Sequence, residues 1–151
     1  EVSSGHTLVQ PGMILQVVNA TKDVQVSTTS NTFVDTGIAA TITPKFATSK
    51  ILVNCCCNGF QKSTANTYSK FILLRDSTEI SIIITPIGYD NQTQTQVSST
   101  ISTTFLDSPA TTNATTYKVQ FNNYPGTGTV YIHSATGGNS ESGITLMEIA
   151  Q

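Results

Sequence analysis

The chain has 151 residues and a formal net charge of −2, and only 11% of its residues are charged, against roughly 25% in an average soluble protein. The few basic residues are scattered along the sequence, which excludes the basic patch that nucleic-acid binding needs. There is no run of about 20 apolar residues, so no transmembrane helix is expected. The length fits one domain with its own core.

Short apolar or alternating runs, separated by Gly, Pro, Asn and Asp, predict β-strands along the whole chain. No window shows sustained helical periodicity with caps, so no helix is predicted. The sequence RDST at Arg75–Thr78 predicts a tight hairpin turn. The many short strands, separated by turns along the whole chain, favour a β-sandwich or jelly roll. The strands are expected near Met13–Asn19, Val24–Thr28, Ile38–Thr43, Lys50–Cys57, Tyr68–Arg75, Glu79–Thr85, Gln96–Leu106, Thr115–Asn122, Thr129–Ser134 and Gly143–Ile149.

Two neighbouring strands are apolar at consecutive positions, so that both of their faces are apolar. Phe71–Leu74 form one such run, and Ile82–Ile84 repeat the pattern. A two-layer sandwich covers only one side of each sheet, and no helix is predicted that covers the other side. We therefore expect further copies of the chain to cover these strands in a closed homo-oligomer.

Three consecutive cysteines end one of the apolar strands. In a strand, Cys55 and Cys57 point to one face and Cys56 to the other. An odd number of cysteines argues against a disulfide framework. Zinc needs about four converging ligands, and only His6 and His133 could add nitrogen. We interpret the three residues as buried structural thiols, with an intermolecular cluster around an oligomer axis as the alternative. No metal and no cofactor are expected.

No arrangement in the sequence predicts catalysis. A glycosidase needs two carboxylates facing each other across a cleft, and nothing distinguishes the pair Asp90 and Asp107 from the other carboxylates, most of which suit turns. Ser and Thr are too numerous for a catalytic triad to be recognised among them. His133 lies in a predicted strand, where a structural role is favoured. We expect no enzyme.

Aromatic and amide side chains gather in three predicted loops. Planar rings beside Asn, Gln and Asp stack on a sugar face and hydrogen-bond its hydroxyls, and the same mixture serves protein recognition in loop paratopes. Ordinary turn chemistry explains these residues equally well. Among them we favour Tyr124, because Pro125 and Gly126 predict a turn that holds its ring out to solvent. The candidate receptor-binding residues are Phe60, Gln61, Tyr89, Asp90, Asn91, Asn122, Asn123 and Tyr124.

Four segments carry a resemblance to a known class of proteins: PGMILQVVNAT, TFVDTGIAATITPKFATSKILV, FILLRDST and the terminal SGITLMEIAQ. From about Pro11 to Gln151, the chain resembles the C-terminal domains of tail-fibre and related virion structural proteins of bacteriophages, marine phages especially. Its middle is also similar to the trimeric jelly rolls of the C1q and tumour-necrosis-factor type. The likeness includes no catalytic motif, and the three cysteines depart from the pattern.

The resemblance implies an all-β jelly-roll β-sandwich that assembles as a homotrimer. Residues 1–10 are then an N-terminal arm or the end of an upstream fibre stalk, and residues 11–151 the head domain. The expected function is that of a viral structural protein on the virion surface, the distal head of a fibre.

Such a head binds a host-cell surface receptor, either a glycan or a protein, beside other virion proteins, with no nucleic acid and no membrane insertion involved. A capsid decoration protein or fibre trimerisation cap without receptor binding remains the alternative. A polysaccharide depolymerase is less favoured, for want of a distinct carboxylate pair.

Overall fold

The structure, a computed structural model, describes residues 8–89, 99–133 and 140–151. Within these residues all regular secondary structure is β, and the ten predicted strands are confirmed. The largest difference is at the third long strand, which continues past the cysteines. Residues 96–98 and Ser134, included in two of the predicted strands, lie outside the described part. The strands are β1 (Ile14–Lys22), β2 (Val26–Thr28), β3 (Val34–Ile42), β4 (Lys50–Lys62), β5 (Ser69–Arg75), β6 (Thr78–Ile87), β7 (Ser99–Asp107), β8 (Thr115–Asn123), β9 (Val130–Ile132) and β10 (Ser142–Ile149).

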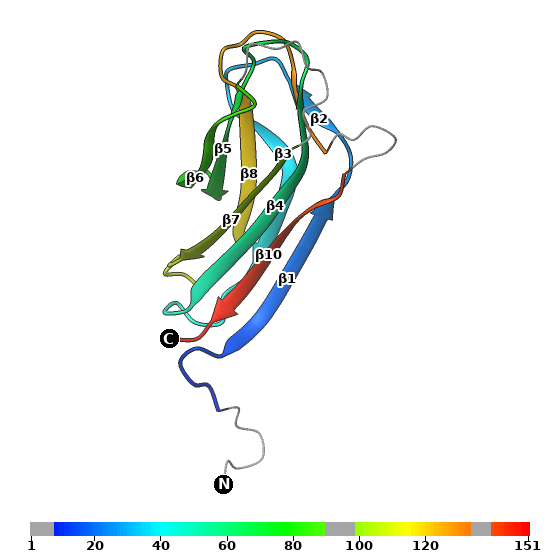
Figure 1. Ribbon diagram of the computed structural model, residues 1–151. Helices are drawn as coiled ribbons and strands as arrows, with labels where there is room; N and C mark the ends of the chain where they lie inside the picture. Colours follow the sequence, from blue (N-terminus) through cyan, green and yellow to red (C-terminus); the bar gives the residue numbers. More distant parts are fainter. Residues whose placement is uncertain (1–7, 90–98, 134–139) are drawn as a thin grey trace.

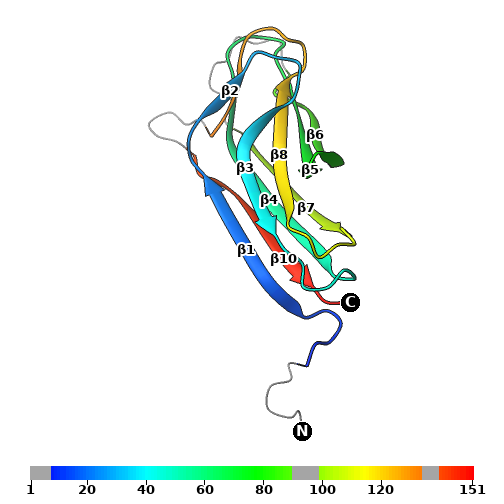
Figure 2. The same cartoon turned by 180° about the vertical axis from the view of Figure 1, so that it is seen from behind.

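The strands form two antiparallel sheets that pack face to face (Figure 1). One sheet has the order β1-β10-β4-β7, and β2 and β9 extend it beyond the ends of β1 and β10. The other has the order β3-β8-β5-β6, and Figure 2 shows it from the opposite side. Neighbouring strands are thus mostly distant in sequence, which is the Greek-key strand order of a jelly roll. The predicted jelly-roll sandwich is confirmed, while its trimeric C1q-like form stays a prediction.

The core lies between the two sheets, where alternate residues of each strand face inward. An aromatic group forms its centre, with Phe60 edge-on to Phe71 at 5.9 Å and Phe71 stacked on Phe121 at 5.5 Å between ring centroids. Burying each such ring stabilises the fold by roughly 1.5–3 kcal/mol. The described part of the chain, residues 8–89, 99–133 and 140–151, contains no helix that is long and apolar enough to cross a membrane.

The apolar run of β5 is covered within a single chain, which corrects the reason for expecting a partner there. Phe71 and Leu73 face the core, and Ile72 and Leu74 on the outer face are still only 3% and 7% exposed. The neighbouring strand places the long side chain of Gln120 directly opposite Ile72. This face of β5 is therefore covered without a second copy of the chain.

The isoleucine run of β6 has a different explanation, a β-bulge. Phe71 pairs with Ile84 and the next residue of β5 pairs with Ile82, so Ile83 is an extra residue on its strand. Both Ile83 and Ile84 pack against the core, whereas Ile82 is half exposed. Three consecutive isoleucines thus reflect a break in the alternation of one strand, and cover of Ile82 by a second copy of the chain stays a prediction.

The other sheet carries an apolar row on its outer face. Val17, Met147, Leu52 and Leu106 are aligned by register across β1, β10, β4 and β7. Val17 is 56% and Leu106 50% exposed. We call these four residues the outer row; sequence analysis did not identify it, because only the strand register aligns them.

The cysteines divide between the faces of β4 as predicted. Cys55 and Cys57 face the core and are buried, and all three thiols are free. Cys56 is on the outer face and only half buried, so the expectation that all three are buried was wrong for this residue. No group of three or more possible metal ligands occurs among the described residues.

Candidate ligand-binding cavity

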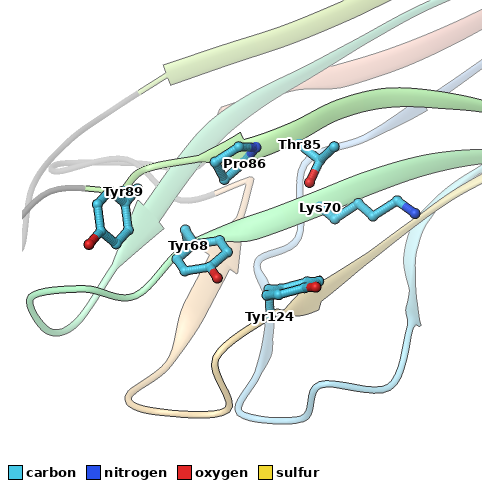
Figure 3. A pocket seen from close by; sticks show the side chains of 6 residues that line it. All are labelled: Tyr68, Lys70, Thr85, Pro86, Tyr89 and Tyr124. Atoms are coloured by element: carbon cyan, nitrogen blue, oxygen red, sulfur yellow. The ribbon is translucent and has the colours of Figure 1, made fainter.

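An open cavity of about 630 Å³ lies at one end of the β3-β8-β5-β6 sheet. This is the end away from the first described residues and from Gln151 (Figure 1). Its volume is in the range of small-molecule sites, about 300–1,000 Å³. Figure 3 shows the six residues that line it: Tyr68, Lys70, Thr85, Pro86, Tyr89 and Tyr124. We call it the tyrosine cavity.

Tyr68 and Tyr124 meet because they are opposite each other on antiparallel strand ends. The backbone N–H of Tyr124 donates to the carbonyl of Tyr68 at 3.0 Å, just beyond the pairing of β5 with β8. Side chains at such positions start about 5 Å apart, and the two rings stack with their centroids 5.2 Å apart. The chain then turns, with the N–H of Gly126 donating to the carbonyl of Asn123 at 3.1 Å. The Tyr124 ring is 54% exposed.

Tyr89 reaches the cavity from the end of β6, over the buried ring of Phe60. Gly88 has a φ of +86°, and a Cβ at this position would be 2.6 Å from the Phe60 Cε1 atom. Only glycine meets both demands, positive φ and close approach. The Tyr89 ring then meets Tyr68 edge-on at 5.4 Å, and it is 65% exposed.

Lys70 places one positive charge in the cavity wall. It lies in β5, two residues after Tyr68, which directly precedes the strand, and its side chain therefore lies on the same outer face. Its Nζ atom is 5.6 Å from the ring centroid of Phe33, a cation–π contact. Its backbone N–H donates to the Asn122 side-chain oxygen at 3.1 Å, which fixes this part of β5 against β8. Among the described residues, no carboxylate forms an ion pair with Lys70.

Two of the three predicted asparagines, Asn122 and Asn123, are structural. Asn122 is 4% exposed, and its Nδ2 donates to the carbonyl of Asn31 at 2.9 Å. Asn123 is fully buried and donates to the carbonyls of Thr127 and Gly128, both at 2.9 Å. They hold the loops behind the cavity, so neither presents its amide to a ligand.

The other predicted residues are divided between different places. Phe60 belongs to the core and supports Gly88, so its ring is not available to a receptor. Gln61 lines a separate cavity of about 240 Å³ with Gln25 and Tyr131 among its neighbours. Asp90 and Asn91 lie outside the described residues. Of the eight candidates, the tyrosine cavity brings together Tyr89 and Tyr124.

Sequence analysis missed Tyr68, directly before β5, and Lys70, in β5. The spacing of two residues places them on one face of a strand, which was readable from the sequence. Their proximity to Tyr124 depends on the register of β5 with β8, and that register cannot be read from the sequence.

Asp107, which the sequence analysis compared with Asp90 as a glycosidase carboxylate pair, belongs to a structural hydrogen-bond network. Arg75 Nη1 donates to both of its carboxylate oxygens, at 3.0 and 2.9 Å. The buried Tyr117 hydroxyl donates to the same carboxylate at 2.6 Å. Burial, and next the hydrogen bond to Asp107, raise the pKa of Tyr117 well above its usual value. These contacts join β5, β7 and β8 at the end of the molecule opposite the cavity.

The lining of the tyrosine cavity combines aromatic rings with a few polar groups. Its six residues supply three phenol rings, a proline ring, a threonine hydroxyl and an ammonium group. None of the six has a carboxylate, imidazole or thiol that acts as a general base or nucleophile.

No family model matches the sequence, and no curated protein matches it. Solved structures with a similar fold include the VP2 subviral particle of infectious bursal disease virus, with 16% identity, 89% of this chain and 41% of that chain covered, and a TM-score of 0.43. The Gx strain of the same virus gives 16% identity, coverage of 89% and 40%, and a TM-score of 0.42. A mutant VP2 protein in T=1 particles gives 13% identity, coverage of 99% and 44%, and a TM-score of 0.43. The chain spans about two fifths of the length of these proteins. The likeness concerns the fold alone, and nothing about binding or assembly follows from it.

Proposed function

We propose that the protein is a structural component of a virion, the head of a fibre, and that it binds a host-cell surface glycan in the tyrosine cavity. One observation carries the proposal: Tyr89 and Tyr124, chosen from the sequence as receptor contacts, lie with Tyr68 in one cavity at an end of the sandwich. The sequence resemblance to phage fibre heads supplies the virion context.

A sugar ring fits the chemistry of this lining. Exposed tyrosine rings offer apolar faces on which the C–H groups of a pyranose pack, and their hydroxyls pair with sugar hydroxyls. The backbone beneath the rings is ordered by strand pairing and by the turn at Gly126, so little flexibility is lost when a ligand binds. A rigid aromatic platform of this kind suits weak, repeated contacts.

The position of the cavity suits a distal head. The first described residues and Gln151 lie together at the opposite end of the sandwich (Figures 1 and 2). If residues 1–10 are an arm or the end of a stalk, as the resemblance implies, the cavity faces away from that attachment.

The homotrimer is part of the same proposal, but with a different interface from the one expected at β5. The outer row of Val17, Leu52, Leu106 and Met147 crosses all four strands of the β1-β10-β4-β7 sheet. Along β1, β10, β4 and β7, the outward-facing positions beside this row carry mainly Asn, Thr and Ser, with Lys50 at one end. A second copy of the chain brings an equally neutral face, so little charge repulsion opposes contact. Three copies present three cavities, and effective concentration converts weak contacts into firm adhesion.

A decoration protein or trimerisation cap is the second candidate, and the outer row is the observation that favours it. This surface serves assembly whether or not the chain binds a receptor. The two candidates differ only at the tyrosine cavity, because a cap has no use for exposed rings at the far end of the molecule.

A glycan array tests the proposal. The purified protein is expected to bind a restricted group of surface glycans, and Tyr124→Ala should lose most of this binding with an unchanged melting temperature. Phe46→Ala is the matched control, because Phe46 is another exposed ring, 45% exposed, in the loop between β3 and β4. Binding lost equally in both variants, or binding by neither the wild type nor the variants, contradicts the proposed glycan site.

A further inference from the structure

We propose that the sugar bound in the tyrosine cavity carries a negative charge, as a uronic acid or a sulfated ring does, and that Lys70 binds the anionic group. This inference rests on the proposed function, since it assigns the ligand class of the same cavity. Two features of the cavity carry it: the way the rings pack on one another, and the position of the ammonium group.

The packing of the rings excludes a cation-binding cage. An aromatic cage holds a quaternary ammonium between separated ring faces. Here Tyr68 and Tyr124 stack directly with centroids 5.2 Å apart, and Tyr89 meets Tyr68 edge-on at 5.4 Å. No cation fits between rings in contact. The tyrosines instead form a continuous platform whose free faces are open to the side of a flat ligand.

The charge in the wall also disfavours a cation. Lys70 is the one charged residue among the six that line the cavity. In Figure 3 its side chain extends beyond the tyrosines along one side of the cavity. The contact with Phe33 holds the ammonium group there without neutralising it, because a ring face contributes no formal charge. Lys118, farther along the adjacent strand β8, has its own partner, Asp35, at 2.9 Å.

The same position selects an anion. An ammonium group has three N–H donors, and a carboxylate or sulfate oxygen accepts a charge-assisted hydrogen bond that is shorter and stronger than a neutral one. A ligand that stacks on Tyr124 and extends toward Lys70 makes both contacts at once. A neutral sugar makes only the stacking contact. Because the cavity is open to solvent, we expect the charge to strengthen binding by about three- to tenfold.

The test compares matched pairs of oligosaccharides by calorimetric titration of the purified protein. One pair is a mixture of uronic-acid oligosaccharides and the same mixture after its carboxyl groups are reduced to alcohols. The other is a sulfated mixture and its desulfated form. The anionic member of at least one pair should bind about three- to tenfold more tightly than its neutral form, and added salt should reduce this difference.

Lys70→Met should abolish the preference and leave binding of the neutral form unchanged. Lys45→Met is the matched control, since Lys45 is exposed in the loop between β3 and β4, outside the cavity and the outer row, and its loss should keep the preference. Equal binding of anionic and neutral forms by the wild type, with Tyr124→Ala still weakening both, overturns the role of Lys70 while the glycan site stands. Absence of binding by every mixture overturns the glycan site itself.

Discussion

At the residue scale, the shape of the cavity depends on groups that do not line it. Tyr89 is exposed, yet its position follows from Gly88 passing over the buried ring of Phe60. Tyr124 follows two asparagines that anchor the surrounding loops. The aromatic and amide composition of these loops predicts a receptor site, which stays a prediction, and the amides of Asn122 and Asn123 serve the fold instead.

Gly88→Ala should damage both stability and the cavity. Its Cβ would meet the Phe60 ring at 2.6 Å, and the φ of +86° is unfavourable for alanine. We expect a loss of about 2–4 kcal/mol in the free energy of unfolding, from combined strain and overpacking, and weaker glycan binding. Urea unfolding measures the first effect.

Gly126→Ala is the control for this substitution. Gly126 has a similar φ of +69°, but no atom lies within 4 Å of an added Cβ. The free energy of unfolding of this variant should therefore fall by only about 1–2 kcal/mol, the cost of placing alanine at a positive φ. Equal losses in the two variants contradict the claim that contact with Phe60 sets the position of Gly88.

His133 should make stability depend on pH. Burial, with a smaller effect of nearby Lys22, lowers its pKa from the usual value of 6.5. Its Nε2–H donates to the carbonyl of Thr36 and its Nδ1 accepts from the Ser142 hydroxyl, both at 2.8 Å, so the neutral ring is the bound form. The unfolded state takes up a proton first as the pH falls, and stability present above about pH 6.5 is then lost.

Urea unfolding between pH 7.5 and 5 measures this dependence. The wild type should lose stability on acidification with a slope of at most about 1.4 kcal/mol per pH unit, the limit for one proton. His133→Gln should be less stable at neutral pH and should lose most of the slope. A variant with the same slope as the wild type shows that other groups are responsible.

At the element scale, β4 illustrates what a strand pattern determines. The alternation of its cysteines correctly separated Cys55 and Cys57 from Cys56. The pattern did not determine what lies against each face, because that depends on the other strands.

Of the three thiols, Cys56 should be the first to react with a thiol reagent. It lies half buried on the outer face, so at most dissociation of a partner is needed to expose it. Cys55 and Cys57 are buried in the core, and they should react only on unfolding. Mass spectrometry of peptides, after brief labelling of the native protein, identifies the labelled residue. Native labelling of Cys57 at the rate of Cys56 contradicts the assignment of faces.

The strand ranges and the jelly-roll class followed from the sequence, because turn residues and period-2 runs are local signals. The hairpin at Arg75–Thr78 is confirmed for the same reason, with Asp76 at a φ of +53° in the turn. The bulge at Ile83, the outer row and the pairing of Tyr68 with Tyr124 were not predictable in this way. Each is set by the register between strands that are distant in sequence, and a shift of that register by one residue moves every side chain of the strand to the other face of the sheet.

At the scale of the whole molecule, two outer sheet faces compete as the oligomer interface. The sequence favoured β5 and β6, whereas the structure leaves Val17 and Leu106 of the outer row exposed on the opposite sheet. Leu106 and Ile82 represent the two faces and are equally exposed, at 50% each. They therefore offer a matched pair of substitutions.

Leu106→Asp should convert the oligomer to monomers, while Ile82→Asp should leave it intact. A carboxylate buried in an apolar interface costs several kcal/mol, whereas one on a free surface costs little. Light scattering should give about 48 kDa for the wild type and Ile82→Asp, three times the 16.1 kDa chain, and the chain mass for Leu106→Asp. If Ile82→Asp dissociates the oligomer and Leu106→Asp does not, the interface lies at β6 and not at the outer row. A monomeric wild type contradicts the trimer.

The central claim is that the tyrosine cavity binds the receptor glycan, and NMR of the tyrosine rings tests it most directly. The chain has five tyrosines and no tryptophan, and selective ring labelling gives a small set of signals. Addition of an array-selected glycan should shift the signals of Tyr68, Tyr89 and Tyr124, while the signals of the buried Tyr117 and of Tyr131, which lines the separate smaller cavity, stay unchanged. A glycan that binds without moving the three cavity signals, or that moves Tyr131 instead, contradicts the account.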